Sequence, residues 1–138
     1  MSLRSRAVLM STVRAAIGIA SIAAPTQAAR VAGYPANHDN PTARLMSGLF
    51  GVRELLLAWL VIDAAATRDG LTAGVFALQS AVDAADVVVQ SMPVFKREGI
   101  DRAALGGIAV AAVASVMWAR LARSARRTAS TGAMACTR

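Results

Sequence analysis

Residues 103–119, AALGGIAVAAVASVMWA, form an apolar run without a charged side chain. A helix needs about 20 mostly apolar residues to cross the hydrocarbon core of a bilayer. With its flanks this run extends over residues 101–121, which is long enough to span. The whole chain has a matching composition, because 56% of its residues are hydrophobic and only 17% are charged. The sequence therefore predicts an integral membrane protein.

Three further apolar stretches come before this run. They cover residues 6–24, 45–66 and 71–92. Pro25 closes the first stretch and Pro93 the third, while a short polar connector follows the second. Short connectors favour antiparallel neighbours. We therefore expect an all-α, four-helix up-down bundle over residues 1–122 that crosses the membrane four times.

Charged residues interrupt three of the four stretches, and they are the main argument for a soluble alternative. A charge in the middle of a bilayer costs about 2.5–3.5 kcal/mol on insertion scales. In a soluble, alanine-rich bundle the same charges would lie on a hydrated face. Soluble helices, however, usually carry a whole polar face opposite their apolar stripe, and these stretches do not. The membrane interpretation is favoured.

The first stretch has a second interpretation, as a cleaved signal peptide. Arg4 and Arg6 precede its apolar run, and small residues follow it. Arg14 interrupts the run, whereas the apolar core of a signal peptide is normally continuous. We expect a retained helix.

The net charge of +7 is concentrated near the two ends of the chain. Because Lys and Arg near spanning helices are kept in the cytoplasm, both termini are expected there, in a bacterial cytoplasmic membrane. Residues 123–138 are expected to form a flexible basic tail that contacts anionic lipid headgroups. Aromatic residues make up only 4% of the chain, so nucleic-acid binding is not favoured. Membrane lipids and a further membrane protein or second copy are the expected partners.

No catalytic, cofactor or metal signature is found. The single cysteine, Cys136, allows no internal disulfide and no thiolate metal site. His38 and Asp39 lie together in a proline-bracketed connector, where an acid–base pair is conceivable, but no further His or Cys completes a ligand set. We interpret this connector as a turn that caps the neighbouring helix.

Charged residues of the second and third stretches are expected to meet inside the membrane. Arg53 lies eight residues from the start of 45–66, and Asp83 lies nine from the end of 71–92. Both should be on the order of 12 Å deep, at one level on antiparallel neighbours. The third stretch also places its polar residues on one helical stripe. The expected polar cluster comprises Arg53, Glu54, Gln79, Asp83, Asp86 and Gln90.

Two roles are open for this cluster. It can be a polar clamp between helices, in which each charge neutralises another. It can instead line a cavity for a proton, a cation or a lipid-like headgroup, because ionisable residues within membranes often mark functional sites. Three acids face Arg53 alone, so at least one acid should be protonated unless Arg14 or a ligand joins them.

The fourth stretch carries small residues at four-residue steps, a spacing that lets helix backbones approach closely in lipid. These residues are Ala103, Gly107, Ala111 and Ser115. We expect them to form a packing face, either within the bundle or between protomers.

Several short motifs occur in a recognisable order: RAAIG at 14–18, RLM at 44–46, GVRE at 51–54 and DAAD at 83–86. This order resembles the small four-helix DoxX-like bacterial membrane proteins, in particular relatives of domain-of-unknown-function type. The likeness covers about residues 6–121. It implies a four-helix bundle in the cytoplasmic membrane, and some members of that family accompany redox enzymes as membrane subunits. This chain departs from a redox role because no cysteine or haem-ligand pair lies within its apolar stretches.

The leading functional hypothesis is therefore a non-enzymatic accessory or partner-binding membrane subunit. The alternative is a transporter-like or ligand-binding bundle that uses the polar stripe of the third stretch.

Overall fold

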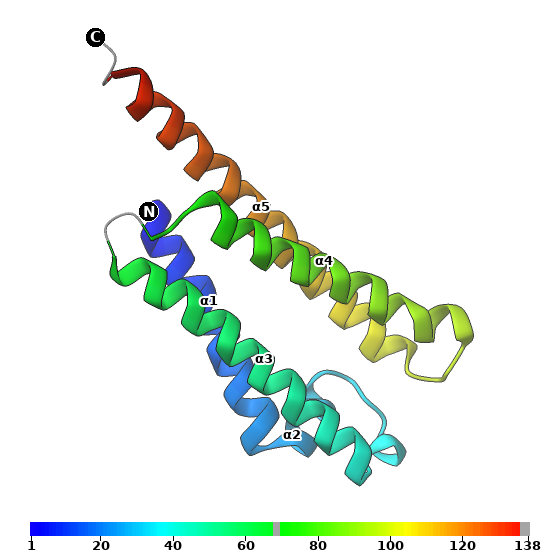
Figure 1. The fold of residues 1–138 in the computed structure, drawn as a ribbon. Coiled ribbons are helices and arrows are strands. Elements are labelled where there is room, and N and C mark those ends of the chain that lie inside the picture. The colour runs from blue at the N-terminus through cyan, green and yellow to red at the C-terminus, as the bar shows by residue number, and fades with distance from the viewer. Residues whose placement is uncertain (68–69, 136–138) are drawn as a thin grey trace.

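A computed structural model describes residues 1–67 and 70–135 of the chain, and this part is helical without a strand. Four helices are long and two elements are short. In chain order they are α1 (Leu3–Ala23), α2 (Pro25–Val31), the 3-10 helix η1 (Ala36–His38), α3 (Pro41–Ala66), α4 (Ala73–Lys96) and α5 (Asp101–Ala135) (Figure 1). The predicted all-α class is confirmed.

Capping side chains start three of the long helices. Ser2, Asn40 and Thr72 each accept a hydrogen bond from the backbone N–H three residues ahead, at the beginning of α1, α3 and α4. Such caps satisfy donors that the first helical turn leaves unpaired. Asn40 thus gives the connector before α3 the capping role expected from the sequence.

The long helices associate as two antiparallel pairs, α1 with α3 and α4 with α5 (Figure 1). Most tertiary contacts lie within a pair, and far fewer connect one pair to the other. In particular, α3 and α4 follow each other in the chain but contact each other much less than each contacts its pair mate. The structure therefore shows two packed layers, and a four-helix bundle with one shared core is not confirmed.

A close backbone approach joins α1 to α3. A Cβ atom added at Gly18 would lie 2.8 Å from the carbonyl oxygen of Gly51, and one added at Gly51 would lie 2.6 Å from that of Gly18. Only glycine fits at both positions. One turn away, the Ser47 hydroxyl donates a hydrogen bond of 3.0 Å to the carbonyl oxygen of Ser21.

The small residues of α5 lie against α4. Ser115 and Ser80 exchange hydrogen bonds, because each hydroxyl donates to the other residue's carbonyl oxygen, at 2.9 and 3.0 Å. A Cβ at Gly107 would overlap the side chain of Gln90. Ala103 and Ala111 on the same stripe are buried. This stripe packs within the chain.

An apolar core joins the two pairs at the end of the molecule that holds the N-terminus (Figure 1). Its stacked rings are those of Phe76 and Trp118, whose centroids are 6.0 Å apart. All four long helices contribute to this core. Its buried members are Ala7, Val61, Phe76, Trp118, Leu121 and Ala122.

Three helical segments among the described residues are long and apolar enough to cross a membrane: Leu3–Ala23, Pro41–Ala66 and Asp101–Ser130. These segments indicate a membrane protein. Helix α4 is not among them, because its stripe of Gln and Asp residues lowers its hydropathy. The fourth crossing stays a prediction. Large apolar side chains are also exposed along the helices, such as Trp59 at 62% and Val110 at 64%.

Helix α5 is longer than the sequence led us to expect. It was expected to end near residue 121 and to be followed by a flexible tail, but it continues as a helix to Ala135. The extension is rich in Ala and Arg, which are strong helix formers. Cys136 and the rest of the expected tail lie outside the described residues.

Two alanine substitutions on α3 test the close approach of α1 and α3. Gly51→Ala should lower the free energy of unfolding by about 1–3 kcal/mol, because the new methyl group meets backbone that cannot move aside. Gly48→Ala is the matched control, since a Cβ there meets nothing within 4 Å. It should be neutral or stabilising by up to about 1 kcal/mol, because alanine favours helix. Thermal unfolding in detergent measures both, and an equal response of the two variants would contradict the packing.

Candidate functional site

Arg14 of α1 lies between three helices and is only 6% exposed. It is one turn before Gly18, so the close approach of α1 and α3 brings its guanidinium group beside α3. Its Nη1 donates to Oε2 of Glu54 at 2.9 Å, and its Nη2 donates to Oδ1 of Asp83 at 2.5 Å. A single side chain of α1 therefore contacts carboxylates of both α3 and α4.

Arg53 of α3 makes the second connection between the layers. Its Nη1 and Nη2 donate to the two carboxylate oxygens of Asp86 at 2.7 and 2.6 Å. This two-point geometry is the strongest arrangement available to Arg and a carboxylate. The guanidinium carbon also lies 5.0 Å from the ring centroid of Phe50, which is within cation–π range. Its side chain is 38% exposed, so Arg53 is less enclosed than Arg14.

Glu54 joins the two arginines into one network. Its Oε1 accepts from Arg53 at 2.9 Å, while its Oε2 accepts from Arg14. The result is a continuous chain of ion pairs across α1, α3 and α4, which we call the ionic network. Its members, in order of contact, are Asp83, Arg14, Glu54, Arg53 and Asp86.

The pairing differs in one respect from what the sequence led us to expect. Arg53 meets Asp86 and Glu54 as expected, but Asp83 pairs with Arg14. Two features of the sequence indicate that Arg14 could join the cluster. It shares a helical stripe with Ser11, Gly18 and Ser21, all buried in the structure. It also lies nine residues before the end of α1 at Ala23, or on the order of 14 Å deep, close to the depth expected for Arg53.

The two glutamines of the α4 stripe have different surroundings. Gln79 is fully buried, and its Nε2 donates to the carbonyl oxygen of Leu57 at 2.9 Å. Gln90 instead lies against Gly107 of α5. The stripe therefore faces α1 and α3 over most of its length and turns to α5 at one end.

Some buried polar atoms near the network have no hydrogen-bond partner. They include Oδ2 of Asp83 and Oε1 of Gln79, both of which are acceptors. The Nε of Arg53 and the hydroxyl of Ser11 are also unpaired. Two cations face three anions in the network, so full ionisation would leave it with a net charge of −1. The network can hold helices together, and one of its three carboxylates can also take up a proton.

Asp39, in the connector before α3, has an ion-pair partner in the first turn of α3. Asp39 accepts hydrogen bonds from Arg44 at 2.7 and 3.1 Å and from Thr26 at 3.1 Å. The hydrogen bond from Arg44 holds the pKa of the Asp39 carboxyl below its usual value. These contacts tie α2 to the first turn of α3 and occupy the carboxylate. The described residues hold no group of three or more His, Cys, Asp or Glu arranged to bind a metal ion.

Residues 11–122 match the family described as a domain of unknown function (DUF4267). The chain belongs to this DUF4267 family. The match covers all five members of the ionic network and most of the four long helices. It agrees with the expectation of an uncharacterised family, and it does not confirm a relation to the DoxX-like proteins. No curated protein and no solved structure matches this DUF4267 chain.

The two arginines of this DUF4267 protein should contribute unequally to stability. Arg14→Gln leaves Asp83 buried without a charged partner and should cost about 3–5 kcal/mol. Arg53→Gln should cost less, because Asp86 is less enclosed than Asp83. Unfolding in detergent measures both, and the double variant Arg14→Gln with Asp83→Asn should recover part of the loss. Equal losses for the two single variants, without recovery in the double one, would contradict the network as described.

Proposed function

We propose that this protein is a membrane-embedded subunit that acts by binding another membrane protein, and that the ionic network serves to hold its two helix pairs together. The observation that carries the proposal is the internal pairing of the network. Every charged member has an oppositely charged partner on another helix or on its neighbour in the same chain. The charged groups of the network are thus paired within the fold. The surface that remains for contact with a partner is apolar.

One exposed face of α3 has the spacing of a helix–helix seam. Its members recur at steps of four, three, four and three residues, which is the repeat of knobs-into-holes packing. All five are exposed, although the opposite face of α3 is packed on α1. They are Leu45, Leu49, Val52, Leu56 and Trp59. We call this the α3 seam.

Trp59 is the strongest candidate anchor of the α3 seam. Trp is enriched among residues that carry most of the energy of protein interfaces. At seven residues from Ala66, it lies on the order of 10 Å inside the helix end, which is deeper than the usual interfacial belt of Trp side chains. A packed partner helix explains an aromatic ring at this depth better than lipid does.

We propose that the protein lies in a bacterial cytoplasmic membrane. Four crossings of a bacterial cytoplasmic membrane, with both termini in the cytoplasm, agree with the basic residues at the chain ends. The resemblance to DoxX-like proteins supports an accessory role, because some members of that family accompany redox enzymes as membrane subunits.

Substitution in the α3 seam tests partner binding. Membranes that contain the tagged full chain are extracted gently, and the mass of the purified assembly is measured. Wild type should elute with a second protein in fixed proportion, and Trp59→Ala should reduce that protein at least fivefold at unchanged abundance. Val110→Ala on α5 is the matched control, because it shortens an equally exposed apolar side chain away from the seam. A monomeric wild type, or equal retention by both variants, would contradict the proposal.

A second candidate function is the binding or transfer of a proton or small cation through the stripe Gln79, Asp83, Asp86 and Gln90. The observation in its favour is the excess of one carboxylate in the ionic network, next to the unpaired acceptors of Asp83 and Gln79. A proton or a small cation on Asp83 would balance the charge and give Oδ2 a partner.

Asp83→Asn separates this candidate from the clamp. The amide keeps the shape of the side chain but removes the charge. If the variant is stable, a change in proton entry is therefore due to the lost carboxylate and not to unfolding. In vesicles that contain the purified protein and an enclosed pH-sensitive dye, proton entry that is lost in Asp83→Asn at equal protein content would support transfer. Loss of membrane abundance in the same variant would support the clamp, and no proton entry by wild type would exclude the transfer function.

A further inference from the structure

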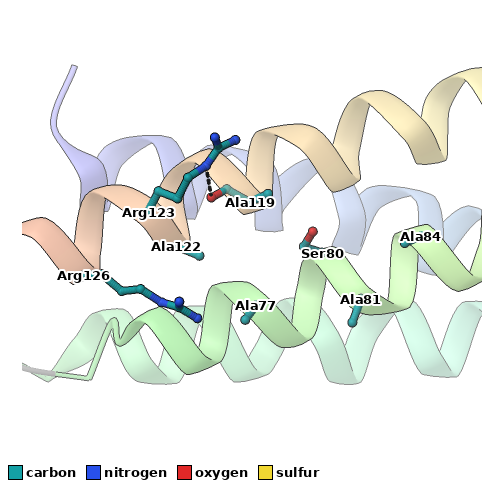
Figure 2. A pocket seen from close by; sticks show the side chains of 8 residues that line it. All are labelled: Ala77, Ser80, Ala81, Ala84, Ala119, Ala122, Arg123 and Arg126. Atoms are coloured by element: carbon teal, nitrogen blue, oxygen red, sulfur yellow. Dashed lines mark hydrogen bonds between the residues drawn. The ribbon is translucent and has the colours of Figure 1, made fainter.

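A groove runs between α4 and α5 on a part of the molecule that the ionic network does not use. Its volume is about 340 Å³, and α1 and α3 contribute none of its lining. Small side chains line it, because the residues that α4 and α5 contribute beside two arginines are alanines and one serine (Figure 2). The lining residues are Ala77, Ser80, Ala81, Ala84, Ala119, Ala122, Arg123 and Arg126.

Two arginines of α5 line this groove, and their side chains point in different directions (Figure 2). Figure 2 shows Arg126 extending from α5 toward Ala77 of α4, whereas Arg123, one turn before it, turns its guanidinium group toward Ala119. Arg123 donates its Nε to the carbonyl oxygen of Ala119 at 3.4 Å. Neither arginine takes part in an ion pair with the acidic side chains in the described part of the chain. The two charges are therefore available to a ligand.

The position of these arginines along α5 corresponds to a membrane boundary. The charge-free run of α5 ends at Ala119, and Arg120 begins a basic segment. The part of the groove formed by Ala81, Ala84 and Ala119 consequently lies on the hydrocarbon side. Arg126 lies about two turns beyond Ala119, on the side where phospholipid headgroups are found. Along the groove, the apolar lining thus corresponds in position to the acyl chain of a phospholipid, and the positive charge corresponds to its phosphate.

We propose that this groove binds one anionic phospholipid, with the phosphate on the guanidinium group of Arg126 and an acyl chain against the alanines. A guanidinium group matches a phosphate in charge and in hydrogen-bond geometry. The alanine surface accepts a chain without a polar partner. This site is separate from the ionic network and from the α3 seam.

A second copy of the chain fits this groove less well. Membrane homodimers are usually related by a two-fold axis, so the same face meets itself. Such a contact would bring the guanidinium groups of both copies together at one level, where they repel one another. A phosphate supplies the opposite charge instead.

Lipid binding to three single variants of the full chain tests the proposal. The purified protein in detergent is titrated with phosphatidylglycerol or phosphatidylcholine, and bound lipid is counted by native mass spectrometry. Wild type should bind one phosphatidylglycerol at least tenfold more tightly than phosphatidylcholine. Arg126→Gln removes the charge and Ala81→Leu fills the apolar part of the groove, so each should weaken phosphatidylglycerol binding at least fivefold. Arg120→Gln is the matched control and should change it less than twofold, because Arg120 does not line this groove.

The outcomes separate the possible occupants. Equal weakening by Arg126→Gln and Arg120→Gln, with no effect of Ala81→Leu, would mean general attraction of lipid to a basic surface and would overturn the site. Conversion of a dimer into a monomer by Ala81→Leu, with unchanged lipid binding, would mean a second copy in the groove and would also overturn it. Unchanged melting temperatures of the variants show that the protein stays folded, so a loss of binding then reports on the groove.

Discussion

The guanidinium group of Arg14, held between the carboxylates of Glu54 and Asp83, is the interaction on which the arrangement of the long helices depends. The three residues belong to three different helices, and each is at least nine-tenths buried. None of these charges tolerates an apolar environment alone, because desolvation costs several kcal/mol per ion (about 2.5–3.5 on insertion scales). They must therefore stay together, and the helices that carry them stay together as well.

Small residues make these charge contacts possible. Gly18 and Gly51 let α1 and α3 approach until Arg14 reaches Glu54, and Ser80 with Ser115 fixes α4 against α5. The two pairs then meet through the ionic network at mid-helix and through the apolar core around Phe76 and Trp118. Ser80 and the alanines near it on α4 and α5 also line the groove beside Arg123 and Arg126, because their side chains are small.

The distribution of polar groups also frames the function. Most charge in the middle of the helices is directed inward and paired, while large apolar side chains such as Trp59 are directed outward. The surface of such a protein is mostly apolar. This agrees with the proposed role of a subunit that binds lipids and other membrane helices. The excess carboxylate and the unpaired oxygens of Asp83 and Gln79 have no role in such contacts, and a proton or cation would give them a partner.

The sequence alone determined the long apolar helices, the end of the first one near Pro25, and the polar stripe of α4, because these depend on local composition and on helical periodicity. It also placed Arg53, Asp83 and Asp86 in one region of the bundle, since depth along a helix follows from residue count, but by depth it paired Arg53 with Asp83. Only the tertiary structure decided that Arg14 pairs with Asp83, that the helices form two pairs, and that α5 continues to Ala135. Which helix faces which depends on the fit of small residues such as Gly18 and Gly51 across a distance in sequence, and one-dimensional periodicity carries no information about that fit.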